Sequence, residues 1–463
     1  MKGHGIWPLA ILAWGIVGCA SPETDDANSL RVPARFSGEG AEGPVADGWM
    51  ADFRDPRLRT LVREALTNNP DIRLTAARLK AAVADAHIAG AGRKLQADLV
   101  FAGSRTKRSS STGFTLNTSR ANRFGPSLDL SWELDVWGRL ADSRTAALLD
   151  AEQARANLQA ARLSLAANTA KAWYNAAEAR LQVQLAGQTL ESYLKNLAVL
   201  EDGLRRGLVQ ALDVRLMRTS VENARNNLAL RQRQHDATRR ALEVLVGRYP
   251  RNELSTVAVL PSINTAVPTG LPSALLKRRP DIVAAQKKFY ATHRRVAAAR
   301  KELLPQIRLT ASGGTSSDEL KEVVDLQRNV WSLAANLTQP LLSGGRLTAQ
   351  VERARALREQ ARHEFVQAAL TAFQEVETTL AAEDFLKDQE TALLSSADEA
   401  GKAESLALAD YQRGLVQIVS VLEAQRRNFD AQRSLIEVQN QRLQNRLDLY
   451  LALGGQFEAQ PTE

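Results

Sequence analysis

The sequence predicts a mixed α+β membrane protein that is mostly α-helical and contains one structural unit twice. The first observation is a repeat with an offset of 207 residues, which takes RGLVQ at 206–210 onto RGLVQ at 413–417, and Gly247 onto Gly454. The second is an alternation of apolar and polar side chains, with a period of two residues, in two stretches of each unit. The third is a seven-residue spacing of apolar side chains along polar stretches. A duplication this regular indicates one supersecondary unit packed against its own copy.

The N-terminus predicts export and lipidation. Residues 1–18 form a signal peptide: Lys2 is followed by a short apolar run that ends at Gly18, directly before Cys19, the single cysteine of the chain. A small residue before such a cysteine resembles a bacterial lipobox. The resemblance implies a diacylglycerol thioether on Cys19, cleavage before it and N-acylation of the new amino terminus, which together anchor a protein stably. An ordinary signal peptide with an incidental cysteine stays open. Residues 19–48, rich in Pro, Gly, Ser and Asp, predict a lipidated tether.

The first structural repeat is predicted at 49–250 and begins with two helices. Asp55-Pro56 is an N-cap followed by proline at the first helical position, and Asn69-Pro70 separates this helix from a second one at about 71–92. NNPDI at 68–72 returns as RRPDI at 278–282, and the helix that follows ends at Leu304-Pro305. We therefore expect a linker at 251–270, a second repeat at 271–454 and a C-terminal tail at 455–463.

Each repeat then predicts a β-hairpin, at about 97–136 and about 306–340. In residues 127–135 apolar and polar side chains alternate, which is typical of a strand with one apolar and one polar face. Residues 97–107 are a plausible partner, and the polar segment at about 108–122 is expected to be a loop. A membrane barrel with a wet lumen suits this pattern and places Asp129 and Glu133 inside. A soluble sheet of two hairpins is the alternative.

Four strands cannot close a spanning barrel, because open sheet edges are not tolerated in lipid and known barrels begin at about eight strands. If the hairpins span a membrane, several protomers must contribute. Two copies would give eight strands and three copies would give twelve.

A pair of long helices follows each hairpin, at about 138–247 and about 345–453. The segment at 140–204 alone would be on the order of 95 Å long. In the last helix apolar side chains recur every seven residues, which predicts supercoiled packing; they are Leu415, Leu422, Phe429, Ile436, Leu443 and Tyr450. Val214, Val221, Leu228 and Leu242 recur similarly in the first repeat. A helical tube and a coiled-coil stalk explain this stripe equally well.

Charge and composition exclude several function classes. The net charge is +8, but the basic residues are scattered beside acidic ones along the helices, so we expect solvated faces and no nucleic-acid binding. The sequence has no zinc-protease, phosphate-loop or nucleophile-elbow motif. Beyond the predicted signal peptide the histidines are far apart in sequence, so we expect neither an enzyme nor a metal site; they are His87, His235, His293 and His363.

Taken together, these segments resemble the TolC/NodT-type outer-membrane efflux channel family over nearly the whole mature chain. The matching stretches include WMADFRDPRLRTLV at 49–62, ELDVWGRL at 133–140, QPLLSGGRL at 339–347 and LYLALGG at 449–455. The resemblance implies a homotrimer with a twelve-stranded outer-membrane β-barrel, four strands per protomer, continued by a long periplasmic α-helical barrel. The lipobox favours the multidrug-pump branch of the family.

The resemblance also implies a periplasmic gate where the helix pairs turn back, within residues 411–426. Glu423 matches an acidic position that would form a ring of three carboxylates in a trimer. Arg426, one helical turn along, could pair with Glu423 or across the trimer axis. Tyr411 and Asp213 match positions that link the two helix pairs.

Two departures from the family pattern leave the details of closure open. Ser420 stands where some members have a second acid, and Val416 stands where some have a gate arginine. For each single gate residue, a solvated helix face is the alternative interpretation.

The function implied is the outer-membrane exit duct of a tripartite efflux system in a Gram-negative bacterium. The partners implied are outer-membrane lipid, a periplasmic membrane-fusion adaptor and an inner-membrane RND-type transporter. The covalent lipid is the one non-protein group expected. The alternative is a non-conducting lipoprotein scaffold across the periplasm, against which the inward Asp129 and Glu133 argue, because a scaffold needs no polar lumen. The sequence leaves the cargo open.

Overall fold

The computed structural model describes residues 32–37, 43, 47–112, 115–257, 259–263 and 267–457. The predicted signal peptide, Cys19 and most of the predicted tether lie outside these ranges.

The elements follow the predicted order in each half of the chain. The first half contains the short 3₁₀ helix η2 (Trp49–Ala51), α1 (Pro56–Asn68), α2 (Pro70–Ala91), β1 (Gln96–Thr112), β2 (Thr115–Leu134), α3 (Arg139–Arg205) and α4 (Ala211–Val246). The second half contains α5 (Pro272–Arg278), α6 (Pro280–Lys301), β3 (Gln306–Thr315), the 3₁₀ turns η3 (Leu320–Glu322) and η4 (Leu326–Arg328), β4 (Asn329–Thr338), α7 (Arg346–Gln412) and α8 (Ile418–Ala452). The helices α3 and α7 each have 67 residues.

Local capping fixes the starts of the first two helices. The carboxylate of Asp55 accepts hydrogen bonds from the backbone N–H groups of Arg57 (2.9 Å) and Leu58 (3.1 Å). The side chain of Asn69 accepts from the N–H of Asp71 at 2.8 Å. Both caps precede a proline at the first helical position, as the sequence predicts.

Three predicted boundaries are wrong. Residues 108–112 and 115–122 are strand rather than the predicted loop, because β1 and β2 pair without interruption from Gln96↔Ser131 to Thr112↔Thr115. The helix α6 ends at Lys301, before the predicted Leu304-Pro305, because the N–H groups of Leu303 and Leu304 donate to the carbonyl groups three residues back, of Arg300 and Lys301, rather than four. Leu415 does not belong to the helical stripe, since it lies in the turn before α8 and is 67% exposed.

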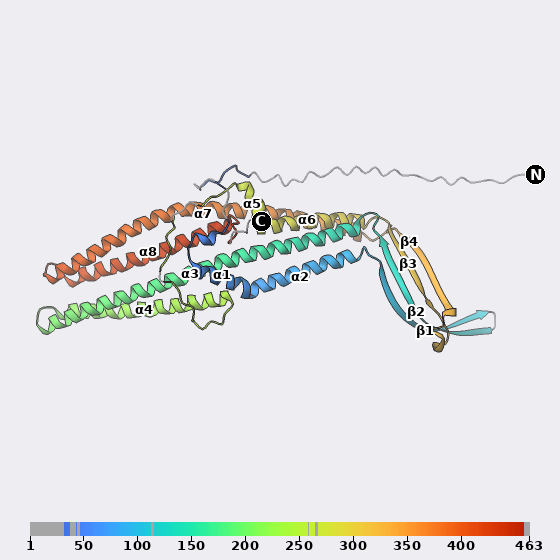
Figure 1. Cartoon of the computed structure of the whole chain (residues 1–463), viewed down its shortest axis with the longest axis horizontal. Coiled ribbons are helices and arrows are strands. Elements are labelled where there is room, and N and C mark those ends of the chain that lie inside the picture. The colour runs from blue at the N-terminus through green and yellow to red at the C-terminus, as the bar shows by residue number, and fades with distance from the viewer. Residues whose placement is uncertain are drawn as a thin grey trace, which may run out of the picture.

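The four strands form one antiparallel sheet in the order β1-β2-β3-β4. In Figure 1 this sheet occupies one end of an elongated molecule, and the turns of the pairs α3/α4 and α7/α8 lie at the opposite end. Within the part of the chain that the structure describes, β1 and β4 each have one unpaired edge. The sheet and the helical turns are therefore separated by the full length of the helices.

The main core lies between these two ends and joins the N-terminal segment to α1, α3 and α8. The ring of Trp49 stacks on that of Tyr450 with centroids 5.8 Å apart, and Phe53 contacts both rings. Trp173 and Tyr174 of α3 are buried in the same cluster. Among the described helices, none combines enough length and apolarity to cross a membrane.

Candidate functional site

Near the turn between α7 and α8, two arginines of α8 bind the carboxylate of Glu423, which lies on the same helix. Its carboxylate accepts hydrogen bonds from Arg426 at 2.9 and 3.0 Å and from Arg427 at 2.8 Å. These bonds lower the pKa of Glu423 to about 2. Of the two pairings expected for Arg426, the structure contains the one within the chain; Arg426 also donates to Asp430 at 3.2 Å.

The predicted pair Tyr411 and Asp213 lies where the two helix pairs meet. Burial and the charge of Asp213 raise the pKa of the Tyr411 hydroxyl, so the two groups are near each other. They form no hydrogen bond, because the buried Tyr411 oxygen has no partner among the described residues. An apolar cluster joins the pairs beside them; it consists of Leu200, Val214, Met217, Ile418 and Val421.

A cleft of about 920 Å³ opens between the two turns. Asp213, Tyr411 and Val416 line it together with residues of both RGLVQ segments. Exposed apolar side chains surround it, including Leu208 (75% exposed) and Leu212 (61%). Ser420 is exposed in the first turn of α8, where its backbone N–H donates to Gln417. The structure thus brings Tyr411, Asp213 and Val416 together and places Glu423 and Arg426 further along α8.

At the other end of the molecule, the strand register sorts side chains onto two faces of the sheet. Leu128 lies opposite Leu99 on β1 and Gly313 on β3, which in turn lies opposite Trp331 on β4. Because strand side chains alternate, one face carries the apolar residues of all four strands; they include Leu99, Phe101, Leu128, Leu130, Trp132, Ile307, Leu309, Trp331, Leu333 and Leu337.

The opposite face of the sheet is polar and carries both predicted lumen residues. Asp129 accepts a hydrogen bond from Ser312 at 2.5 Å, and Glu133 accepts one from Arg139 at 2.6 Å. Asp98 stands beside Asp129 in the register. Both carboxylates therefore lie on the same face, as the alternation predicts, although each is partnered.

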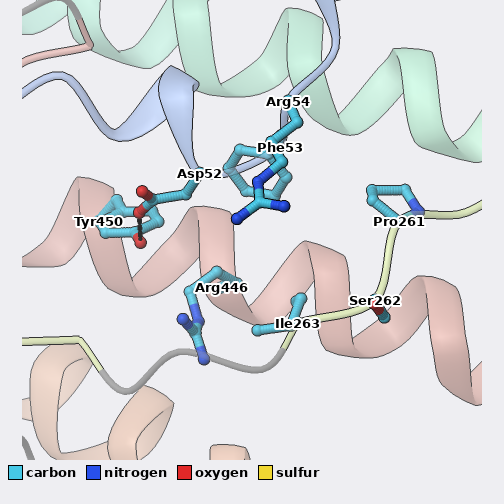
Figure 2. Close-up of a pocket in the computed structure, with 8 residues that line it drawn as sticks. All are labelled: Asp52, Phe53, Arg54, Pro261, Ser262, Ile263, Arg446 and Tyr450. Carbon is cyan, nitrogen blue, oxygen red and sulfur yellow. Dashed lines mark hydrogen bonds between the residues drawn. The ribbon is translucent and has the colours of Figure 1, made fainter.

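Sequence reasoning missed a pocket of about 300 Å³ in the middle of the molecule (Figure 2). Asp52, Phe53 and Arg54 from the N-terminal segment, residues 261–263, and Arg446 and Tyr450 of α8 line it. The Tyr450 hydroxyl donates to Asp52; burial and this bond raise the Tyr450 pKa. Arg446 forms an ion pair with Glu383 of α7. The pocket thus lies at a structural junction, and these partners are so distant in sequence that no motif signals it.

Cys19, the predicted lipid attachment site, lies outside the described residues. Within the described ranges no group of three or more His, Cys, Asp or Glu side chains is placed to hold a metal ion. The geometry combines a sheet with one apolar and one polar face, two pairs of long helices and a cleft between the helical turns.

Comparison with known proteins identifies the family. The model of the family described as "Outer membrane efflux protein" matches residues 61–248 and 271–455. The chain is 31% identical over 410 residues to the toluene efflux pump outer membrane protein TtgF of Pseudomonas putida, covering 89% of this chain and 85% of TtgF. It is 29% identical to the cation efflux system protein CusC of Escherichia coli K12, and the match covers 96% of this chain and 98% of CusC.

A solved structure gives the same result. The open state of the MtrE outer membrane channel of Neisseria gonorrhoeae superimposes with a TM-score of 0.83 at 28% identity, covering 93% of this chain and 96% of that one. The family match, the similar sequences and the similar solved structure all indicate the same family. The chain therefore belongs to the outer membrane efflux protein family, and it acts in transport as the outer-membrane component of an efflux system of a Gram-negative bacterium.

Proposed function

We propose that three copies of this chain form a passive exit duct, with a twelve-stranded barrel in the outer membrane and a helical tube across the periplasm. The observation that carries the proposal is the sheet with one apolar face, one polar face and two open edges. In lipid such edges must be paired, and pairing β4 of each protomer with β1 of the next closes a ring. The apolar face then meets lipid, and Asp129 and Glu133 line the lumen.

The equal lengths of α3 and α7 support our proposal that the two halves are copies of one unit. In a trimer these copies would alternate around the tube. Cys19 would carry the diacylglycerol and N-acyl lipid that anchors the chain. A periplasmic adaptor and an inner-membrane transporter would complete the pump and supply its energy. Since relatives named for toluene and for cations are similarly related to this chain, we propose that the transporter rather than the duct selects the cargo.

We further propose that the turns of the helix pairs form the gate. Glu423 and Arg426 of the three protomers would surround the constriction, with Tyr411, Asp213 and Ser420 beside it. The pairing within α8 keeps Glu423 ionised down to a pH of about 2. Its folded pKa is depressed, so its ion pair is complete above the ordinary pKa of about 4.3 and is lost only as the pH falls through about 2.

Single-channel conductance in a planar bilayer tests the duct and the gate together. We expect a small wild-type conductance that grows several-fold in Glu423→Ala/Arg426→Ala, and no step attributable to Glu423 between about pH 8 and about pH 5. The matched control is Glu222→Ala/Arg225→Ala, which removes an exposed Glu–Arg pair of the same spacing from α4.

Three outcomes would count against parts of the proposal. An equal, sizeable conductance in all three proteins would keep the duct and move the gate away from Glu423. A larger conductance in both double variants would show a general effect of removing a charged pair. A silent wild type, in protein shown to be folded and inserted, would favour the non-conducting scaffold.

A further inference from the structure

The hairpin of β1 and β2 carries an unbalanced positive charge. Residues 99–128 contain no Asp or Glu and five basic residues, Arg105, Lys107, Arg108, Arg120 and Arg123. All five are exposed. Among the residues that the structure describes, none of the five forms an ion pair, whereas Arg218, Arg295 and Arg426 of the helical body are each paired with a carboxylate. Unpaired neighbouring cations repel one another unless an external anion neutralises them.

The register divides these cations between the two faces. The β1–β2 pairing has no bulge from Gln96↔Ser131 to Thr112↔Thr115, so alternation persists along the whole hairpin. Arg105 and Lys107 follow Leu99 and Phe101 on the apolar face, and Arg120 lies opposite Lys107. Arg108 and Arg123 are on the other face.

The apolar face therefore changes to a basic one at a defined level. On this face the rings of Phe101 and Phe124 come before the cations, and Arg105 is four residues beyond Phe101, roughly 13 Å along the strand. Leu116 is the one apolar position among the described residues of this face that lies beyond the cations. The pairing of β2 with β3 begins at Ser127↔Gly314, so the basic segment extends beyond the four-stranded sheet (Figure 1). A protein surface that passes from the hydrocarbon of a bilayer into its headgroups shows the same order: apolar side chains, then aromatic rings, then cations.

We infer that Arg105, Lys107 and Arg120 bind the phosphate groups of lipopolysaccharide in the outer leaflet of the membrane; this inference rests on the proposed insertion of the sheet as a barrel. The helical body extends from one end of the sheet, so the hairpin emerges on the opposite, external side of the membrane. The glycolipid there carries phosphates, which arginine recognises by bidentate hydrogen bonds and lysine as a point charge.

The loop between β3 and β4 supplies the competing contact. It contains Asp318, Glu319, Glu322 and Asp325. Arg328 pairs with Glu322 at 2.5 Å and with Asp318 at 3.3 Å, so the acidic groups of this loop are partly neutralised within it. A bond between the hairpin and this loop of a neighbouring protomer is the alternative that the experiment must separate from lipid binding.

The test compares two double variants of the full-length purified protein in detergent. Arg105→Gln/Lys107→Gln removes two charges from the apolar face, and Arg108→Gln/Arg123→Gln removes two from the other face. The probe is the lipid A–Kdo₂ core of lipopolysaccharide, and the comparisons are its enzymatically dephosphorylated form and phosphatidylglycerol, each presented in the same detergent micelles. Affinity for each is measured by fluorescence titration, with oligomer mass and bilayer conductance recorded on the same preparations.

We expect Arg105→Gln/Lys107→Gln to weaken binding of the phosphorylated glycolipid about tenfold, and the control pair to change it less than about twofold. Wild type should bind the dephosphorylated form as weakly as the first variant does. Equal losses in both variants, or equal affinity for phosphatidylglycerol, would overturn a specific site. Unchanged binding with a less stable oligomer would assign the cations to the acidic loop instead. If only the apolar-face variant loses binding but the wild-type protein does not conduct, the result would support the lipid site and contradict the duct alone.

Discussion

At the scale of single residues, Glu243 shows how one buried carboxylate organises an irregular segment. It lies near the end of α4 and is 2% exposed. Its oxygens accept hydrogen bonds from the backbone N–H groups of Asn252 (2.7 Å), Glu253 (2.6 Å) and Leu254 (3.0 Å). The start of the linker after α4 is thereby fixed against the helical body.

Glu243→Gln should therefore destabilise the folded protein by about 1–3 kcal/mol at neutral pH, because an amide cannot accept all three bonds. Burial favours a higher pKa for Glu243, but the backbone bonds and Arg239 outweigh it and lower the pKa. A depressed folded pKa gives stability above the ordinary value of about 4.3 that disappears as the pH falls through the folded pKa. Urea unfolding of wild type and variant should converge in acid.

The exposed Glu222 provides the control, since Glu222→Gln should change the urea midpoint little at any pH. A Glu243→Gln protein as stable as wild type at neutral pH would contradict the role assigned to these three bonds.

How far sequence predicted these residues depends on the separation of their partners. The pairing of Glu423 with Arg426 was predictable because three residues separate them on one helix. The Tyr411 hydroxyl lacks the link to Asp213 that the family resemblance implies, because its position depends on how two helix pairs approach each other. Glu243 was not predicted, since its partners lie in an irregular segment without a pattern.

At the scale of elements, the turns that join the long helices depend on one glycine each. Gly207 and Gly414 have φ values of 75° and 77°. At each turn the N–H of the following leucine closes back onto the helix, from Leu208 to Gly203 O at 2.8 Å and from Leu415 to Asp410 O at 2.9 Å. This is the Schellman arrangement, in which a left-handed residue ends a helix.

Gly207→Ala and Gly414→Ala should each destabilise the turn by about 1 kcal/mol. The loss is conformational, since a methyl group at either position meets no atom within 4 Å. Gly187→Ala is the matched control: it has equally open surroundings but lies inside α3, where alanine should stabilise by about 0.5–1 kcal/mol. Hydrogen exchange at the turn amides measures the difference, and protection that rises in all three variants would refute the assignment.

The start of α1 and the turn after α3 were predictable because caps and turn glycines are local signals, as at Asp55 and Gly207. The strand content of 108–122 was not, because a polar hairpin and a polar loop have the same composition. For the same reason the five hairpin cations seemed dispersed in sequence. The absence of any acidic residue from 99 to 128 was the available signal, and only the register reveals that Arg105, Lys107 and Arg120 share a face.

At the scale of the whole molecule, insertion of the sheet should distinguish its two faces. Leu333 is 74% exposed on the apolar face, and Ser332 is its neighbour on the polar face. Leu333→Arg should disfavour insertion by about 2–4 kcal/mol, whereas Ser332→Arg should leave it nearly unchanged. The inserted fraction in liposomes, measured by protease protection, provides the readout. Equal effects of the two substitutions would exclude a lipid-facing apolar surface.

The open edges of the sheet have a genetic consequence. If every protomer must pair with two neighbours to close the ring, one defective subunit spoils the whole assembly. If the assembly is the proposed trimer, a cell that makes equal amounts of wild-type and defective chain would form only about one assembly in eight with three wild-type copies. Variants at β1, β4 or the helical turns should therefore act as dominant alleles, whereas variants that prevent the chain from folding should be recessive.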